Sequence, residues 1–234
     1  PVLIEAGRFR EHWPKTKRKD GKLWRYDPCP ATVPVLLDSG AFSMISKHGR
    51  WTITAREYID FARRVVEALR TVLFVATQDW MCEPDMLRKT GLSLEEHQRR
   101  TVQSYIELRD LAPELPLLPA LQGYSTEDYL RCADRYGAAG VDLAALPLVG
   151  LGSVCRRSGT DELVEVIRAI SKALPGIRLH GYGVTSAGVL LSCRELRSAD
   201  SEAWSSRGRG MEIDLRAEFG LPAATPWRDV LAAR

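Results

Sequence analysis

The sequence lacks several features that would assign the protein to a well-known class. No hydrophobic run approaches the roughly 18 residues of a membrane-spanning helix, and the first residues lack the pattern of a secretory signal. We therefore expect a cytoplasmic protein with no membrane partner. The five cysteines are widely spaced and include no C-x-x-C pair, so we expect neither a zinc site nor a redox motif, and no cofactor.

The composition is typical of one globular domain. The 234 residues are 45% hydrophobic and 27% charged, which suits one α/β barrel, so we assign residues 1–234 to a single domain. The net charge of +3 is unevenly distributed, because residues 12–30 combine basic and aromatic side chains. That combination is typical of nucleic-acid-binding surfaces and also of solvated loops. The candidate phosphate contacts within this segment are Lys17, Arg18 and Lys19.

Apolar runs alternate with helical patterns, which predicts βα units and a parallel sheet. The candidate strands run from Val2 to Ala6, Pro34 to Asp38, Val72 to Thr77, Leu117 to Gln122, Val141 to Ala145, Arg178 to Gly183 and Ala199 to Trp204. Two helices should begin at capping boxes, from Thr54 to Glu57 and from Ser93 to Glu96. Further helices are expected from Asp128 to Tyr136, Thr160 to Leu174 and Thr185 to Leu196.

Two architectures fit this alternation, a closed (β/α)8 TIM-like barrel and an open doubly wound sheet. An open nucleotide-binding sheet would place a glycine-rich phosphate turn after its first strand, and the segment from Glu5 to Phe9 contains no such turn. The barrel is therefore the preferred α/β fold. Its eighth strand is not obvious, and Pro116 and Pro119 lie where a central strand is expected, so we expect a trimmed or distorted barrel.

Polar residues and glycines gather at the ends of the expected strands, where the loops of a barrel converge and catalytic residues lie. The groups are Asp38-Ser39-Gly40, Gln78-Asp79, Gln122-Gly123-Tyr124, Gly150-Leu151-Gly152, Gly181-Tyr182-Gly183 and Asp200-Ser201. Each group could also serve only as a helix cap or a turn. If the fold brings Asp38 and Asp200 together, their carboxylates form a site that can exchange a group at an anomeric carbon.

Five segments, in order, resemble the tRNA-guanine transglycosylase superfamily, whose (β/α)8 barrels exchange guanine for a 7-deazaguanine. They are Asp38 to Ser43 (D-S-G-G-F-Q in the family), Leu121 to Gly123 (V-Q-G-G), the glycine-rich loop Leu148 to Val154, Gly181 to Val184, and Asp200 to Trp204 with the following Arg207-Gly208-Arg209. The chain lacks the zinc subdomain of the family's tRNA enzymes. It is most similar to the branch that places deazapurines in DNA, known from phages and bacterial DNA-modification clusters.

The resemblance implies a role for each candidate residue. Asp200 would be the nucleophile that forms a covalent intermediate at C1′, and Asp38 would be the general acid or base. Asp79 would accept hydrogen bonds from N1–H and the exocyclic amine of a guanine-like ring. The base pocket would also include Ser39, Gly40, Gln122, Gly123, Leu151 and Gly152, with Phe42, Tyr124 and Tyr182 as stacking or core aromatics. Arg207 and Arg209 would hold phosphates.

On this interpretation the protein is a guanine transglycosylase whose substrates are DNA and a free 7-deazaguanine base such as the queuosine-related preQ0. A homodimer is compatible with the sequence. Three alternatives remain open. One is a tRNA-guanine transglycosylase-like enzyme acting on RNA. The second is a glycosidase or nucleoside hydrolase that uses the same two aspartates, and the third is a non-catalytic nucleic-acid-binding subunit.

Overall fold

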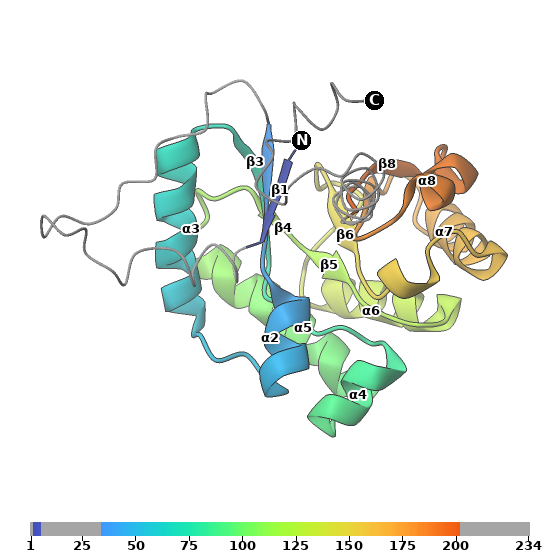
Figure 1. Ribbon diagram of the computed structural model, residues 1–234, viewed down its shortest axis with the longest axis horizontal. Coiled ribbons are helices and arrows are strands. Elements are labelled where there is room, and N and C mark those ends of the chain that lie inside the picture. Colours follow the sequence, from blue (N-terminus) through green and yellow to red (C-terminus); the bar gives the residue numbers. More distant parts are fainter. Residues whose placement is uncertain (1, 6–33, 202–234) are drawn as a thin grey trace, which may run out of the picture.

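The computed structural model describes residues 2–5 and 34–201 and has a mixed α/β architecture (Figure 1). Its strands form two four-stranded parallel sheets, ordered β1-β2-β3-β4 and β5-β6-β7-β8. The strand order follows the sequence, as the alternation of apolar and helical patterns predicts. The strands are β1 (Val2–Glu5), β2 (Val35–Asp38), β3 (Val72–Ala76), β4 (Leu117–Leu118), β5 (Ala120–Leu121), β6 (Val149–Leu151), β7 (Leu179–Gly181) and β8 (Leu196–Ala199).

Pro119 divides one expected strand into β4 and β5 and so separates the two sheets. β4 pairs with β3, and β5 pairs with β6. Proline has no N–H to give to a sheet, although the carbonyl of Pro119 accepts a hydrogen bond from Gly150 at 2.8 Å. The expected interruption at this proline is therefore present. Among the described strands, no ladder joins the two sheets into one closed barrel.

The strand predicted from Val141 to Ala145 is wrong. These residues begin a turn in which the carboxylate of Asp142 accepts hydrogen bonds from the N–H groups of Ala144 and Ala145. Val141 and Leu143 are buried in the core, so their apolar character serves packing rather than strand pairing. The strand in this part of the chain is β6, within the segment that the resemblance identified as a glycine-rich loop.

The last predicted strand and helix are displaced along the chain. The helix expected to reach Leu196 is α8 (Ser186–Ser192), and Leu196 instead begins β8. β8 ends at Ala199, so Asp200 immediately follows the strand's carboxyl end. The remainder of the predicted strand, from residue 202 onward, lies outside the described residues. The shift places Asp200 where a catalytic residue of an α/β protein is expected.

The described part of the chain contains seven α-helices, and none of them is both long and apolar enough to cross a membrane. Besides α8 they are α2 (Ala41–His48), α3 (Ala55–Leu69), α4 (Pro84–Thr90), α5 (Leu94–Leu111), α6 (Thr126–Ala138) and α7 (Asp161–Ala173). Thr54 begins α3 with a complete capping box. Ser93 caps α5 through its hydroxyl, but Glu96 pairs with Arg99 and Arg100 instead of reaching back. The short helices α2 and α4 were not predicted.

The hydrophobic core has two main clusters, one for each sheet. In the first cluster, α3 packs its buried face, including Tyr58 and Val65, against β2 and β3. In the second, α6 and α7 pack residues such as Tyr129 and Ile167 against β5, β6 and β7. Figure 1 shows α3 beside the first sheet and α7 beside the second. This packing fixes the strands, and the loops after them carry the polar residues of the candidate site.

Candidate active site

Three aspartates lie at the carboxyl ends of strands. Asp38 is the last residue of β2, Asp79 follows β3, and Asp200 follows β8. All three act on the hydroxyl of Tyr182, which follows β7. Burial raises the pKa of that hydroxyl, and the negative charges of Asp79, Asp38 and Asp200 raise it further. All three carboxylates therefore lie near enough to the phenol for their charges to affect it.

The Tyr182 hydroxyl is buried, and within the described residues it has no hydrogen-bond partner. Its ring lies over the backbone of Gly150, where an added Cβ would come within 2.7 Å of the ring's Cζ. The ring also meets the edge of His180, with 5.0 Å between the ring centroids. Leaving a buried polar group unpaired costs about 1–3 kcal/mol, which a hydrogen bond to a ligand would recover. The Tyr182 hydroxyl is thus an unsatisfied polar group beside the candidate site.

Asp200 is held in place through one of its two carboxylate oxygens. Its Oδ1 lies 3.1 Å from Nε2 of His180 and 3.2 Å from the backbone nitrogen of Gly183. A carboxylate only accepts hydrogen bonds, so His180 carries a proton on Nε2, and its Nδ1 lies 2.8 Å from the Ser198 hydroxyl. Oδ2 accepts no hydrogen bond from the residues that the structure describes. Asp200 is thus oriented through Oδ1, which leaves Oδ2 without a partner among the described residues.

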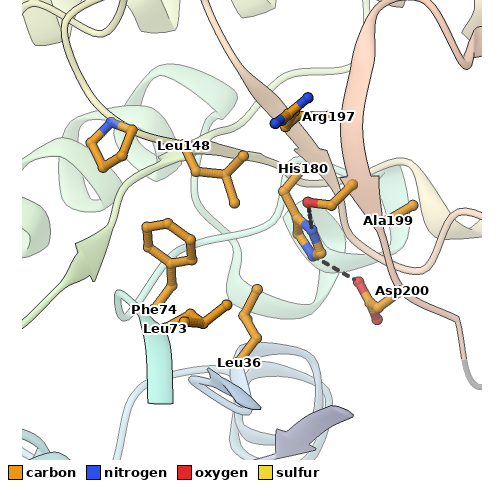
Figure 2. A pocket seen from close by; sticks show the side chains of 10 residues that line it. Leu36, Leu73, Phe74, Leu148, His180, Arg197, Ala199 and Asp200 are labelled. Atoms are coloured by element: carbon orange, nitrogen blue, oxygen red, sulfur yellow. Dashed lines mark hydrogen bonds and ion pairs between the residues drawn. The ribbon is translucent and has the colours of Figure 1, made fainter. Parts of the chain in front are cut away.

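His180 and Asp200 border a cavity of about 300 Å³ between the two sheets. Figure 2 shows these two side chains facing the apolar Leu36, Phe74 and Leu148. Arg197 and Ser198 of β8 contribute further polar groups to the same lining. The cavity is not lined by Asp38, Asp79 or Gln122. It therefore adjoins Asp200, the candidate nucleophile, and not Asp79.

Asp79 is buried, 7% exposed, and accepts hydrogen bonds on both carboxylate oxygens. Ser39 donates to Oδ1 at 3.3 Å, and the side-chain amide of Gln122 donates to Oδ2. Burial raises the pKa of Asp79 to about 6, although the Gln122 and Ser39 hydrogen bonds lower it. Asp79 is therefore a desolvated carboxylate in a fixed orientation, which can pair with two N–H donors of a base.

Both polar atoms of the Gln122 side-chain amide make hydrogen bonds. Its Nε2 faces Asp79, and its Oε1 lies 2.6 Å from the hydroxyl of Ser153. The amide packs directly on Gly152, where an added Cβ would overlap it. Gln122, predicted as part of the base pocket, contacts Asp79 and fixes its orientation, while its contact with the base stays a prediction. Gly152, predicted as part of the pocket, provides the space that this orientation needs.

A row of polar residues on α5 holds the loops of the site. His97 bonds the carbonyl of Met81 at 2.6 Å, and Thr101 accepts from the N–H of Trp80 at 2.9 Å. Gln98 donates to the carbonyl of Gln122 at 2.8 Å. All three side chains are buried. The sequence analysis missed them, although polar residues at i, i+1 and i+4 on the buried side of an amphipathic helix are the signal that could have revealed them.

The other predicted pocket residues lie around the same strand ends. Ser39 is buried beneath Asp79, and Gly40 precedes α2 with a φ of 77°. Gly123 packs so closely on α6 that an added Cβ would lie 2.7 Å from the backbone nitrogen of Tyr129. The side chain of Leu151 is fully buried in the core, whereas the prediction for this residue concerns its backbone and stays a prediction. Within the described residues, no group of three or more His, Cys, Asp or Glu could hold a metal ion.

The predicted phosphate contacts Lys17, Arg18, Lys19, Arg207 and Arg209 lie outside the described residues. A different basic group is present beside the strand ends. The guanidinium of Arg156 lies 5.5 Å from the ring centre of Phe42, and that of Arg157 lies 4.3 Å from the ring centre of Tyr124. We call these four residues the rim. Phe42 and Tyr124 are 45% and 38% exposed, so both rings face solvent as well as an arginine.

Parallel strands with carboxylates at their carboxyl ends place this chain among the α/β enzymes whose chemistry lies in the loops after the strands. The family model described as DpdA, DeoxyPurine in DNA protein A, matches residues 16–214, and the chain belongs to that family. It is a family of DNA deazapurine transglycosylases related to tRNA-guanine transglycosylase. Membership implies a transglycosylase-type enzyme with DNA as its substrate. No curated protein matches the chain.

Proposed function

We propose that the protein exchanges guanine in DNA for a free 7-deazaguanine base through a covalent aspartyl–DNA intermediate. The observation that carries this proposal is that Asp38, Asp79 and Asp200 lie at the carboxyl ends of three strands, with Asp79 and Asp200 each oriented by hydrogen bonds. One carboxylate with an oxygen that no described residue bonds, a second for proton transfer and a third for base recognition are the groups that a base exchange requires. We further propose that the two sheets belong to one interrupted (β/α)8 barrel.

In the first half of the reaction, Oδ2 of Asp200 attacks C1′ of a deoxyguanosine in DNA as the bond from C1′ to the base breaks. Asp38 donates a proton to the departing guanine and becomes a carboxylate. His180 and the Gly183 N–H keep Oδ1 fixed, which leaves Oδ2 aligned for attack. The product is an ester between Asp200 and the deoxyribose, with one free guanine.

In the second half, the deazaguanine replaces guanine against Asp79. Asp38 removes the proton from N9 of the incoming base, and N9 attacks C1′ while the ester bond to Asp200 breaks. Both carboxyl groups return to their first states, so each guanine released is matched by one deazaguanine inserted. A paired nucleotide must leave the duplex to reach these residues. The exposed rim residues Phe42, Tyr124 and Arg156 would then contact the neighbouring part of the DNA strand.

Exchange and hydrolysis differ in whether guanine release needs a second base. DNA with labelled guanine should lose label continuously only when free deazaguanine is present. Without the free base, release should stop at or below one guanine per enzyme. Continuous release without the free base would show a hydrolase instead.

We expect His180→Phe to slow formation of the covalent adduct by roughly 10- to 100-fold. The phenyl ring fills similar space but gives Asp200 no hydrogen bond, so Oδ1 keeps only the Gly183 N–H. Rapid-quench measurement of the adduct with excess DNA isolates this step. Ser198→Ala, which removes only the partner of His180 Nδ1, serves as the milder control. An adduct rate equal to that of the natural protein would exclude the positioning role.

We expect Arg156→Ala to weaken DNA binding by roughly 3- to 10-fold and to reduce the salt dependence of binding by about one phosphate contact. The guanidinium of Arg156 lies over the ring of Phe42 and pairs with Asp85 at 2.6 Å. Because this ion pair is half exposed, Arg156 can exchange Asp85 for a DNA phosphate. The matched control is Arg63→Ala, because Arg63 is similarly exposed but pairs with Glu114, before β4 at the opposite ends of the strands. If the DNA-binding constants of the two variants depend on salt concentration with the same slope, the rim does not contact DNA.

A further inference from the structure

Four buried side chains form a continuous hydrogen-bonded chain from Asp79 to Glu83. Gln122 donates from Nε2 to Asp79, and its Oε1 lies 2.6 Å from the Ser153 hydroxyl oxygen. That oxygen lies 3.0 Å from Oε2 of Glu83. It also accepts a hydrogen bond from the N–H of Cys82 at 2.7 Å. Asp79, Glu83, Gln122 and Ser153 are all at most 7% exposed, so water does not replace these contacts.

The number of protons in the chain follows from its geometry. Gln122 turns its NH₂ toward Asp79, so its Oε1 can only accept a hydrogen bond from Ser153. The serine hydroxyl has one hydrogen, which is then used. An ionised Glu83 has no hydrogen to offer, and two oxygens without a hydrogen between them repel. The contact between Ser153 and Glu83 is therefore satisfied only when Glu83 carries a proton and donates it to Ser153.

We propose that Glu83 is a positioning residue that holds this proton and, through Ser153 and Gln122, keeps Asp79 ionised and oriented toward the base. The inference rests on the proposed function, in which Asp79 accepts hydrogen bonds from two N–H groups of the base. It assigns Glu83 no contact with the substrate. Its effect passes through the amide of Gln122, which can turn its NH₂ to Asp79 only while Ser153 is free to donate to Oε1.

The surroundings of Glu83 both raise and lower its pKa. Burial raises the pKa of Glu83 and so favours the protonated form, which donates to Ser153. A hydrogen bond donated by Ser153 to the ionised form, and the positive charges of Arg156 and Arg157, act in the opposite direction. The negative charge of Glu83 also adds to the burial that raises the pKa of Asp79. Cys82, Cys155 and Tyr129 are the other titratable groups that interact with Glu83. Because the charge of Glu83 affects Asp79, the two carboxyl groups titrate as a coupled pair.

This arrangement predicts that base recognition fails at both ends of the pH range. At low pH Asp79 becomes protonated and no longer accepts from the base. At high pH Glu83 loses its proton. Ser153 can then donate its single hydrogen either to Glu83 or to Gln122, but not to both. The KM for the free base should therefore be lowest at intermediate pH, while kcat at saturating base changes less.

Glu83→Gln is the decisive variant, because a glutamine amide is always able to donate to Ser153. We expect its KM for the free base to stay within about 3-fold of the natural protein at the optimum and to lose the rise at high pH. Glu83→Ala removes the donor and should raise that KM about 10-fold or more across the whole range. If Glu83→Gln keeps the alkaline rise, or raises KM as much as Glu83→Ala, the proposal is overturned.

Difference infrared spectroscopy separates this inference from the proposed function, because it needs neither DNA nor base. The natural protein at the pH optimum should show a carbonyl band of a protonated carboxyl group that Glu83→Gln loses and Asp38→Asn retains, which separates it from the band of protonated Asp38. Ser153→Ala should shift that band, because it removes the hydrogen-bond partner of Glu83. Absence of the band would refute the proton on Glu83 even if base exchange is observed. Its presence supports the proton assignment even if the reaction proves to be a different one.

Discussion

Asp200→Asn should abolish the covalent adduct with DNA and lower base exchange by about 10³-fold or more. The side-chain amide has nearly the same shape as the carboxylate but no negative oxygen to attack C1′. Denaturing electrophoresis of the protein incubated with labelled DNA, without free base, detects the adduct directly. The natural protein should give a band of shifted mobility, and the variant should give none.

The hydrogen bonds of Asp200 make this substitution informative. The carbonyl oxygen of an asparagine can still accept from His180 Nε2 and the Gly183 N–H, so the local structure is retained. DNA affinity and thermal stability should therefore remain close to those of the natural protein. An adduct of unchanged yield in Asp200→Asn would assign the nucleophile to another residue, and Asp38→Asn would be the first variant to compare.

Asp79→Asn should lower kcat/KM for the free base by roughly 10²- to 10³-fold while DNA binding changes little. An asparagine offers the base one acceptor and one donor in place of two acceptors, so one N–H of a guanine-like ring loses its partner. Its NH₂ would also face Ser39 or Gln122, which both donate to Asp79. Exchange rates at varied base concentration, together with DNA affinity, measure the two effects separately.

The pKa of Asp79 adds a pH test to this prediction. Because burial raises this pKa to about 6, the ionised form that accepts from the base is lost as the pH falls through that value. The KM of the natural protein for the free base should rise below about pH 6, and Asp79→Asn should lack this rise. Ser39→Ala, which removes only one donor to Asp79, should cost much less than Asp79→Asn. Equal losses of DNA binding and base exchange in Asp79→Asn would instead indicate a structural role.

The sequence was sufficient for the positions of the strands that end in short polar motifs. Asp38 and Asp79 lie where the alternation of apolar runs placed them, because a buried strand followed by a polar turn has a clear signature. The run from Val141 to Ala145 misled because it is apolar and short, and a buried turn has the same pattern. The break at Pro119 was foreseen because proline cannot donate to a ladder.

Much of the candidate site could not be predicted, because it depends on contacts between distant segments. His180 reaches Asp200 only after β7 and β8 pair, and nothing local to Leu179–Gly181 marks it. Ser153 and Glu83 lie about 70 positions apart in the sequence and meet through the loops after β6 and β3. The contact of Arg156 with Phe42 likewise joins the segment after β6 to α2, which follows β2 of the other sheet.

The central claim is that a deazapurine replaces guanine in DNA, and incorporation measures it directly. The natural protein would be incubated with an isotope-labelled 7-deazaguanine and, separately, with duplex DNA, single-stranded DNA and tRNA. Each polymer would be digested to nucleosides for mass spectrometry. We predict a labelled deazapurine deoxynucleoside from DNA, in an amount equal to the guanine released, and none from tRNA. Label in tRNA alone, or guanine released from DNA without incorporation, would contradict the proposal.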